Sequence, residues 1–148
     1  MVSPNQRRLA VWLLRRDVND SDEPDVVLGA GERSLQMLCV RLAKLVTASG
    51  TQLLLARAIH LAAVENPILL SVRAGMVPGL CLEGLRESGA GAAFEQMEAG
   101  LEAVVSQLIG LLGLFIGEGV TGRLVRDVWP DAPLSLSETD SVAEEARS

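Results

Sequence analysis

The feature that most constrains this chain is the apolar stretch between residues 97 and 130. Large apolar side chains recur there at steps of three and four, which is the spacing of one helix face. A line of small residues runs beside that face, although each glycine costs a helix roughly 1 kcal/mol relative to alanine. We predict that this line lets another helix backbone approach closely, either that of residues 51–66 or that of a second subunit. The predicted helix-packing groove consists of Ser106, Gly110, Gly113 and Gly117.

The composition favours helices packed on helices over a β-sandwich. The chain has 148 residues, of which 49% are hydrophobic and 22% are charged, as in one globular domain. Aromatic residues make up only 3% and tyrosine is absent, so the core has to be built from leucine, valine, isoleucine and alanine. The sequence therefore predicts an all-α fold, a single compact helical bundle of five or six helices.

Residues 1–16 are predicted to form a basic amphipathic helix. Ser3 is suited to cap this helix and Pro4 to its first position, and the segment carries four arginines and no acid. Two interpretations remain open. The helix either docks on the body of the protein through Trp12 with its arginines in solvent, or binds an acidic partner or a membrane surface.

Two acidic segments flank the predicted core domain. Residues 17–30 read as an acidic linker that lacks the ligand spacing and central glycine of a calcium-binding loop. Residues 131–148 carry five acids and one arginine without apolar periodicity, which predicts a disordered tail. We expect residues 17–27 and the tail to be dispensable for folding.

The helical core domain is expected at residues 31–130. Its first helix should cover residues 31–48 and end in a glycine cap at Gly50. The next helix is apolar on nearly all sides, which is typical of a central position, and it should end before Pro67. The predicted core side chains are Leu38, Leu42, Leu45, Leu54, Ile59, Leu61, Val104, Leu108, Leu111, Leu112, Phe115 and Leu124.

Residues 117–122 read GEGVTG and match the GxGxxG pattern of dinucleotide-binding loops. Such a loop follows a β-strand, whereas the apolar run before Gly117 has helical periodicity. Only 26 residues remain after Gly122, too few for the strands that the fold would still need. We therefore interpret the pattern as a helix break, followed by a last helix that ends at Val128.

The candidate binding residues are charged side chains on otherwise apolar helices. Arg57 and His60 are three residues apart and can share one helix face, and Glu118 with Arg123 would complete a carboxylate–arginine site. The alternative is a structural ion pair that ties the last helix to the earlier one. With a single histidine in the chain, we predict no catalytic residue, no metal site and no cofactor. Arg126 completes the predicted set of binding residues.

The two cysteines, Cys39 and Cys81, lie in apolar sequence without CxxC spacing. We interpret them as buried reduced thiols of a cytosolic protein, with one disulfide as the alternative. No apolar run reaches the ~20 residues of a membrane span, and the arginines near the start interrupt any signal-peptide pattern. The expected location is cytoplasmic.

The end of the core domain carries a resemblance. The run FIGEGVTGRLVRDVWP, from Phe115 to Pro130, resembles the FIGExxTxRLxRxxWP-like segment of an uncharacterised family of small bacterial all-helical proteins. Further likenesses, such as LLARA at residues 54–58 and ENP at residues 65–67, extend the resemblance over residues 33–130. The family has no assigned activity, so the resemblance implies one helical domain and no chemistry.

The functional prediction is a non-enzymatic helical protein-interaction or regulatory module that can self-associate. The net charge of −6 argues against a nucleic-acid-binding surface. A protein partner or a homo-oligomer is expected, because apolar positions far outnumber polar candidates. The alternative is a small-molecule sensor that holds an apolar ligand between its helices.

Overall fold

The structure is a computed structural model that describes residues 4–15, 18, 23–88 and 93–133. These residues form an all-α fold with one small antiparallel sheet of two strands. Four of its described helices have more than ten residues, rather than the predicted five or six helices, because the helices expected at residues 31–48 and 51–66 form one bent helix. The elements are α1 (Pro4–Arg15), α2 (Pro24–Ala63), η1 (Pro67–Ser71), β1 (Arg73–Ala74), β2 (Leu82–Glu83), α3 (Leu85–Ser88), α4 (Phe94–Phe115) and α5 (Glu118–Val128).

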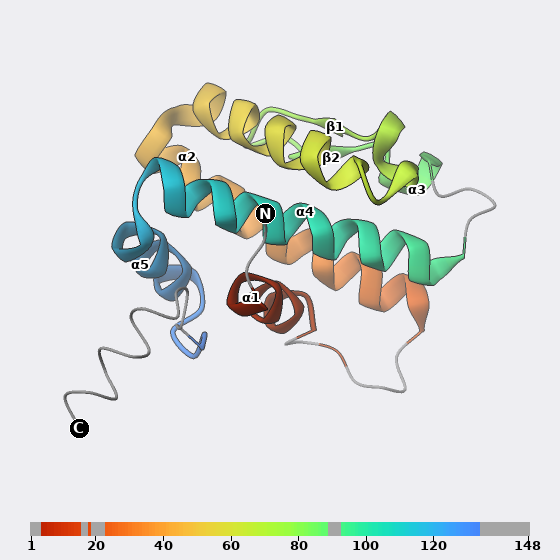
Figure 1. The fold of residues 1–148 in the computed structure, drawn as a ribbon, viewed down its shortest axis with the longest axis horizontal. Helices are drawn as coiled ribbons and strands as arrows, with labels where there is room; N and C mark the ends of the chain where they lie inside the picture. Colours follow the sequence, from red (N-terminus) through yellow and green to blue (C-terminus); the bar gives the residue numbers. More distant parts are fainter. Residues whose placement is uncertain (1–3, 16–17, 19–22, 89–92, 134–148) are drawn as a thin grey trace.

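α4 is the central helix, as the length of its apolar face predicts. It packs against α1, α2 and α5, and Figure 1 shows it crossing the molecule between the two arms of α2. A helix with neighbours on several sides buries more than one narrow stripe. The buried large side chains of α4 are Leu101, Val104, Val105, Leu108, Ile109 and Leu112.

Most of the predicted core side chains are buried or partly buried, but two predictions are wrong. Leu45 is 56% exposed and Phe115 is 69% exposed. Leu45 lies just before the bend of α2, and Phe115 is the last residue of α4. Their helical spacing matches the buried positions, but neighbouring helices no longer cover these ends. The periodicity therefore predicts the correct apolar face of each helix, but it overestimates how much of that face neighbouring helices cover.

The bend in α2 is made by Thr47 and not by the predicted glycine cap at Gly50. Thr47 has φ 70° and ψ 165°, a region that is strained for a residue with a Cβ. Its hydroxyl accepts a hydrogen bond from the Gly50 amide at 3.1 Å, as an N-cap residue does. The first arm of α2 (residues 24–46) thus ends where the second arm (residues 48–63) is capped, and Figure 1 shows the chain turning back at this point.

The boundary predicted for the acidic linker is also wrong. α2 begins at Pro24, and Val27, Leu28 and Ala30 are buried. Proline suits the first turn of a helix because it lacks the amide hydrogen that would be unpaired there. The many acids of residues 17–25 are typical of a linker, whereas the apolar spacing of residues 27–30 belongs to the helix. Most of the remaining linker and residues 134–148 of the tail lie outside the described residues.

α1 is packed into the core domain, so residues 1–16 are not a separate unit. Leu9, Ala10, Leu13 and Leu14 are buried against α4 and α2. The contact is made by these aliphatic side chains more than by Trp12, which is only partly buried. An ion pair between Arg15 and Glu98 adds a polar link to α4. The docked interpretation of this helix is therefore the one that the packing confirms.

The close helix approach predicted along the small-residue line is not present within the described helices. A Cβ added to Gly113 would meet only the Glu118 side chain, at 3.7 Å, and one added to Gly117 would meet nothing within 4 Å. Gly110 faces the side chain of Gln6 on α1 at 3.1 Å. The alanine-rich second arm of α2 does not pack on this line. α1 lies beside Gly110 instead, and Gly113 and Gly117 border open space.

The tightly packed glycines are others, which the sequence did not single out. A Cβ at Gly31 would lie 2.8 Å from Leu101 Cδ2, and one at Gly100 would lie 3.2 Å from Leu69 Cδ2. Both glycines are buried, and a neighbouring leucine fills the space that a larger side chain would need. Isolated glycines of this kind carry no pattern that distinguishes them in a sequence.

Two of the described helices, residues 25–63 and α4, are long and apolar enough to pass a membrane-span criterion by length and composition. Of the tested windows, 28% and 44% of residues respectively are buried inside the protein. A core helix of a soluble protein passes the same criterion, so this is weak evidence for a membrane location.

Candidate functional site

Two of the predicted binding residues, Arg57 and Glu118, line the same open cleft. The cleft has a volume of about 370 Å³ and lies between α1, the second arm of α2 and the C-terminal half of α4. Gly110 and Gly113 of the small-residue line also contribute to it. We call it the Arg57 cleft, and its lining residues are Gln6, Arg57, Leu61, Gln107, Gly110, Leu111, Gly113, Leu114 and Glu118.

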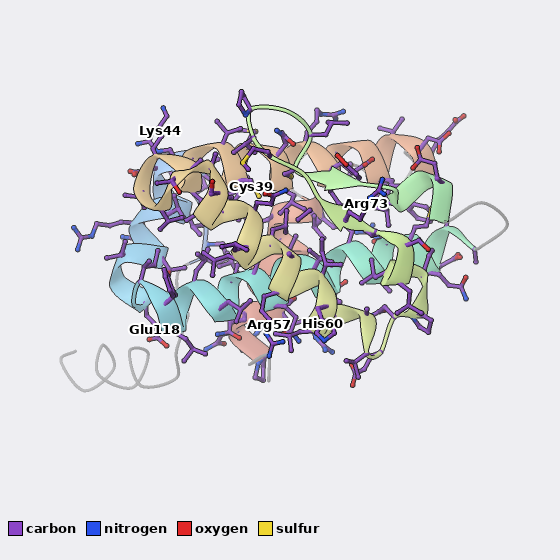
Figure 2. The ribbon with its side chains drawn as sticks, turned by 90° about the horizontal axis from the view of Figure 1, so that it is seen from above. Cys39, Lys44, Arg57, His60, Arg73 and Glu118 are labelled. Atoms are coloured by element: carbon purple, nitrogen blue, oxygen red, sulfur yellow. The ribbon has the colours of Figure 1, made fainter. Side chains whose placement is uncertain are left out.

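His60, Arg123 and Arg126 do not line the Arg57 cleft, although all three are described and exposed. Figure 2 shows Arg57, His60 and Glu118 along one side of the molecule, away from Cys39 and Arg73. α5 turns Leu124 and Val125 inward, which leaves its arginines in solvent. The predicted site is therefore brought together only in part.

The ion pair expected between Arg57 and Glu118 is not formed by these two described side chains. α5 is tied to the first arm of α2 by a different pair, in which Arg41 Nη2 lies 3.3 Å from Asp127 Oδ2. Both members of that pair are about half exposed, so it contributes little stability. Arg57 and Glu118 thus remain opposite charges on the walls of one cleft.

A second cleft of about 300 Å³ adjoins the first and shares Leu61 and Gln107 with it. Ser106 lines this cleft, is only 2% exposed, and its hydroxyl has no hydrogen-bond partner within the described structure. The small-residue line therefore borders two surface clefts instead of a buried helix contact. We call the second one the Ser106 cleft, and its lining residues are Arg7, Leu61, Ala62, Val64, Glu65, Asn66, Ala103, Ser106 and Gln107.

Cys39 and Cys81 are free and buried, as predicted, and they are neighbours. A hydrogen bond between the two thiols, with burial as a second cause, raises the pKa of Cys39 far above its usual value. The same hydrogen bond lowers the pKa of Cys81. The sequence spacing does not predict that the two thiols are neighbours, because their contact depends on a loop that folds back onto α2.

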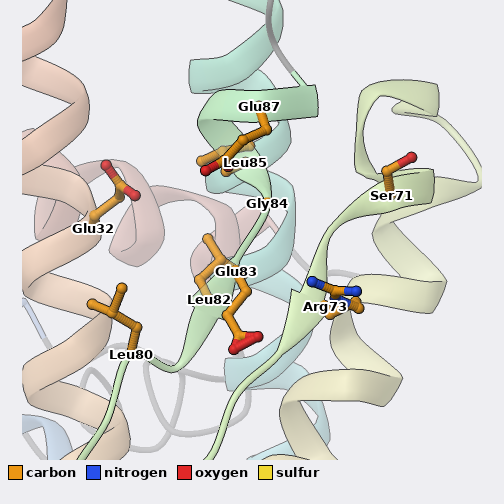
Figure 3. A pocket seen from close by; sticks show the side chains of 9 residues that line it. All are labelled: Glu32, Ser71, Arg73, Leu80, Leu82, Glu83, Gly84, Leu85 and Glu87. Carbon is orange, nitrogen blue, oxygen red and sulfur yellow. The ribbon is translucent and has the colours of Figure 1, made fainter.

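A cleft of about 750 Å³ was not predicted from the sequence. It lies between the first arm of α2 and the small sheet, where Arg73 of β1 is the register partner of Glu83 of β2. Figure 3 shows the carboxylates of Glu32, Glu83 and Glu87 around it. These acids are isolated in the sequence, so no motif pointed to them. No group of three or more metal-binding side chains occurs among the described residues.

No family model, curated protein or solved structure matches this chain. The resemblance of residues 115–130 to an uncharacterised bacterial family therefore stays a prediction. The clefts and the exposed surfaces are therefore the features that bear on the function.

Proposed function

We propose that this protein is a non-enzymatic interaction module that binds a second copy of itself through the Arg57 cleft. One observation carries the proposal. Arg57 and Glu118 bear opposite charges on one open cleft and do not pair with each other. Most dimers of identical chains use a two-fold axis, so that the same patch faces itself. A patch with one unpaired cation and one unpaired anion is complementary to its own copy.

Exposed apolar side chains in the cleft and near Arg57 support a protein partner. Leu114 lines the cleft and is 87% exposed. Leu53 lies one helical turn before Arg57, on the same face of α2, and is 72% exposed. Large apolar side chains gathered beside a cleft are typical of protein-binding surfaces. Their burial in a dimer would supply affinity, whereas the charges would set the orientation.

In the proposed dimer, Arg57 of each protomer faces Glu118 of the other. The two contacts are related by symmetry, so a single substitution changes both. Glu118 lies at the start of α5, where a carboxylate also favours the helix dipole.

Charge reversal tests the proposal. Arg57→Glu and Glu118→Arg are purified separately, and the mass of each is followed by sedimentation equilibrium over a range of concentrations. We expect the unmodified protein to dimerise and each single variant to remain monomeric, because each would place like charges opposite one another. An equimolar mixture of the two variants should regain the dimer, since both cross-contacts then join opposite charges.

The mixture distinguishes a specific contact from a damaged fold. Arg123→Glu is the matched control, because Arg123 is an exposed arginine outside the cleft, and it should leave the mass unchanged. A monomeric unmodified protein, or single variants that dimerise as well as it does, would overturn the proposal.

A further inference from the structure

The buried hydroxyl of Ser106 is the least satisfied polar group in the described structure. A serine inside a helix normally bonds the carbonyl one turn before it or turns toward water. Ser106 does neither, although it is 2% exposed and lines a cleft of about 300 Å³. An unpaired buried polar group is unfavourable, so a ligand that reaches this hydroxyl, once the Ser106 side chain turns toward the cleft, would supply the missing hydrogen bond.

The Ser106 cleft has a positive side and a negative side. Arg7 lies in the first turn of α1, and Glu65 follows the last turn of α2. The partial charges of the two helix ends have the same signs as these side chains, because helices are positive at their N-termini and negative at their C-termini. Arg7 and Glu65, both described, make no ion pair with each other. Each lines the cleft, so both charges are available to a ligand there.

The remaining wall of the cleft is small and apolar. Leu61 and Ala62 come from α2, and Ala103 lies one turn before Ser106 on α4. The volume is at the low end of the ~300–1,000 Å³ typical of ligand sites. The cleft therefore suits a small molecule that carries both charges and a short apolar group.

We propose that the Ser106 cleft binds an aliphatic α-amino acid as its zwitterion. The carboxylate accepts a hydrogen bond from the guanidinium of Arg7 and, after rotation of the Ser106 side chain toward the cleft, a second one from its hydroxyl. The ammonium lies toward Glu65 and the carboxyl end of α2, and the side chain packs on Leu61 and Ala103. The proposal does not rest on self-association, because Arg57 and Glu118 do not line this cleft.

Isothermal titration calorimetry of the full chain with L-leucine tests this site. We expect saturable binding, weakened about tenfold or more by Arg7→Gln, since a lost charge-assisted hydrogen bond is worth ~1.5–3 kcal/mol. Arg8→Gln is the matched control, because Arg8 is exposed and already donates to Asn5 Oδ1 at 2.6 Å. 4-Methylpentanoate, which lacks the amine, and isopentylamine, which lacks the carboxylate, should each bind about tenfold more weakly or worse.

Ser106→Ala separates a ligand-binding hydroxyl from a structural one. The free variant should melt at the same temperature or higher, because an unpaired polar group is removed, but it should bind L-leucine several-fold more weakly. No binding of L-leucine to the unmodified protein would overturn the proposal, as would equal binding by the Ser106→Ala variant. The Arg57→Glu variant, which should not dimerise, should still bind L-leucine. The dimer proposal and the amino-acid proposal can therefore fail independently.

Discussion

The backbone amide of Cys81 donates a hydrogen bond to Oε1 of Gln36 at 2.9 Å, and this contact joins the loop before β2 to α2. The same amide side chain donates from Nε2 to the carbonyl oxygen of Gly79, also at 2.9 Å. Because Cys39 lies one turn further along α2, the two bonds hold Cys81 beside it. One glutamine thus holds Cys81 against the helix that carries Cys39.

Gln36→Ala is expected to lower the free energy of unfolding and to expose the thiols. It leaves the amide of the buried residue Cys81 unpaired, which costs about 1–3 kcal/mol, as urea unfolding would measure. In the unmodified protein we expect neither thiol to react readily with Ellman's reagent before unfolding, because both are buried. Thiols in the variant that react as slowly as in the parent would show that Gln36 does not position Cys81.

Leu53→Glu should weaken the proposed dimer about tenfold or more, because it places a charge in an apolar contact. Leu80→Glu is its matched control, since both leucines are 72% exposed and Leu80 lies by the large cleft near the sheet. Sedimentation equilibrium of the two variants compares them directly. Equal effects of the two substitutions would mean that the face around Arg57 is not the interface.

Gly113→Leu should leave the monomer folded and abolish the dimer. A Cβ at this position meets only the flexible side chain of Glu118, and replacing a helical glycine gains up to about 1 kcal/mol of helix propensity. The larger side chain would nevertheless fill the Arg57 cleft. Circular dichroism melting with light scattering measures both effects.

Gly100→Leu is the counterpart of that substitution. Leu69 already occupies the space beside Gly100, so overpacking should cost about 1–3 kcal/mol or more and lower the melting temperature. A melting temperature that falls equally for both glycine variants would contradict the open position of Gly113.

Leu108→Ala should cost on the order of 2–5 kcal/mol in urea unfolding, since Leu108 is fully buried at the centre of α4. Leu45→Ala provides the comparison, because Leu45 is 56% exposed and surface substitutions usually stay within about half a kcal/mol. A loss below about half a kcal/mol for Leu108→Ala would remove this residue from the core.

The sequence predicted some of the residues of the candidate site, but not how they are arranged. Arg57 and Glu118 stood out because charged side chains are rare on the apolar helices, and the structure brings both to one cleft. Arg7 and Glu65 could not be paired from the sequence, because they belong to different helix ends and share no spacing. The sequence identifies Ser106 only as a small residue, because its hydroxyl is left unpaired only once neighbouring helices have buried it.

The sequence by itself determined the helical class and the central position of α4, because side-chain periodicity and a nearly aromatic-free composition are local properties. It also determined the break at Gly117, which has φ 89°, a conformation that favours glycine. Only the tertiary structure decided where α2 bends, which glycines are tightly packed and which apolar residues stay exposed. Each of these features depends on which element packs against the residue. The periodicity of a helix gives its apolar face but not the element that covers it. The same small-residue line can receive a helix backbone or border an open cleft, and α1 docking beside Gly110 favours the second.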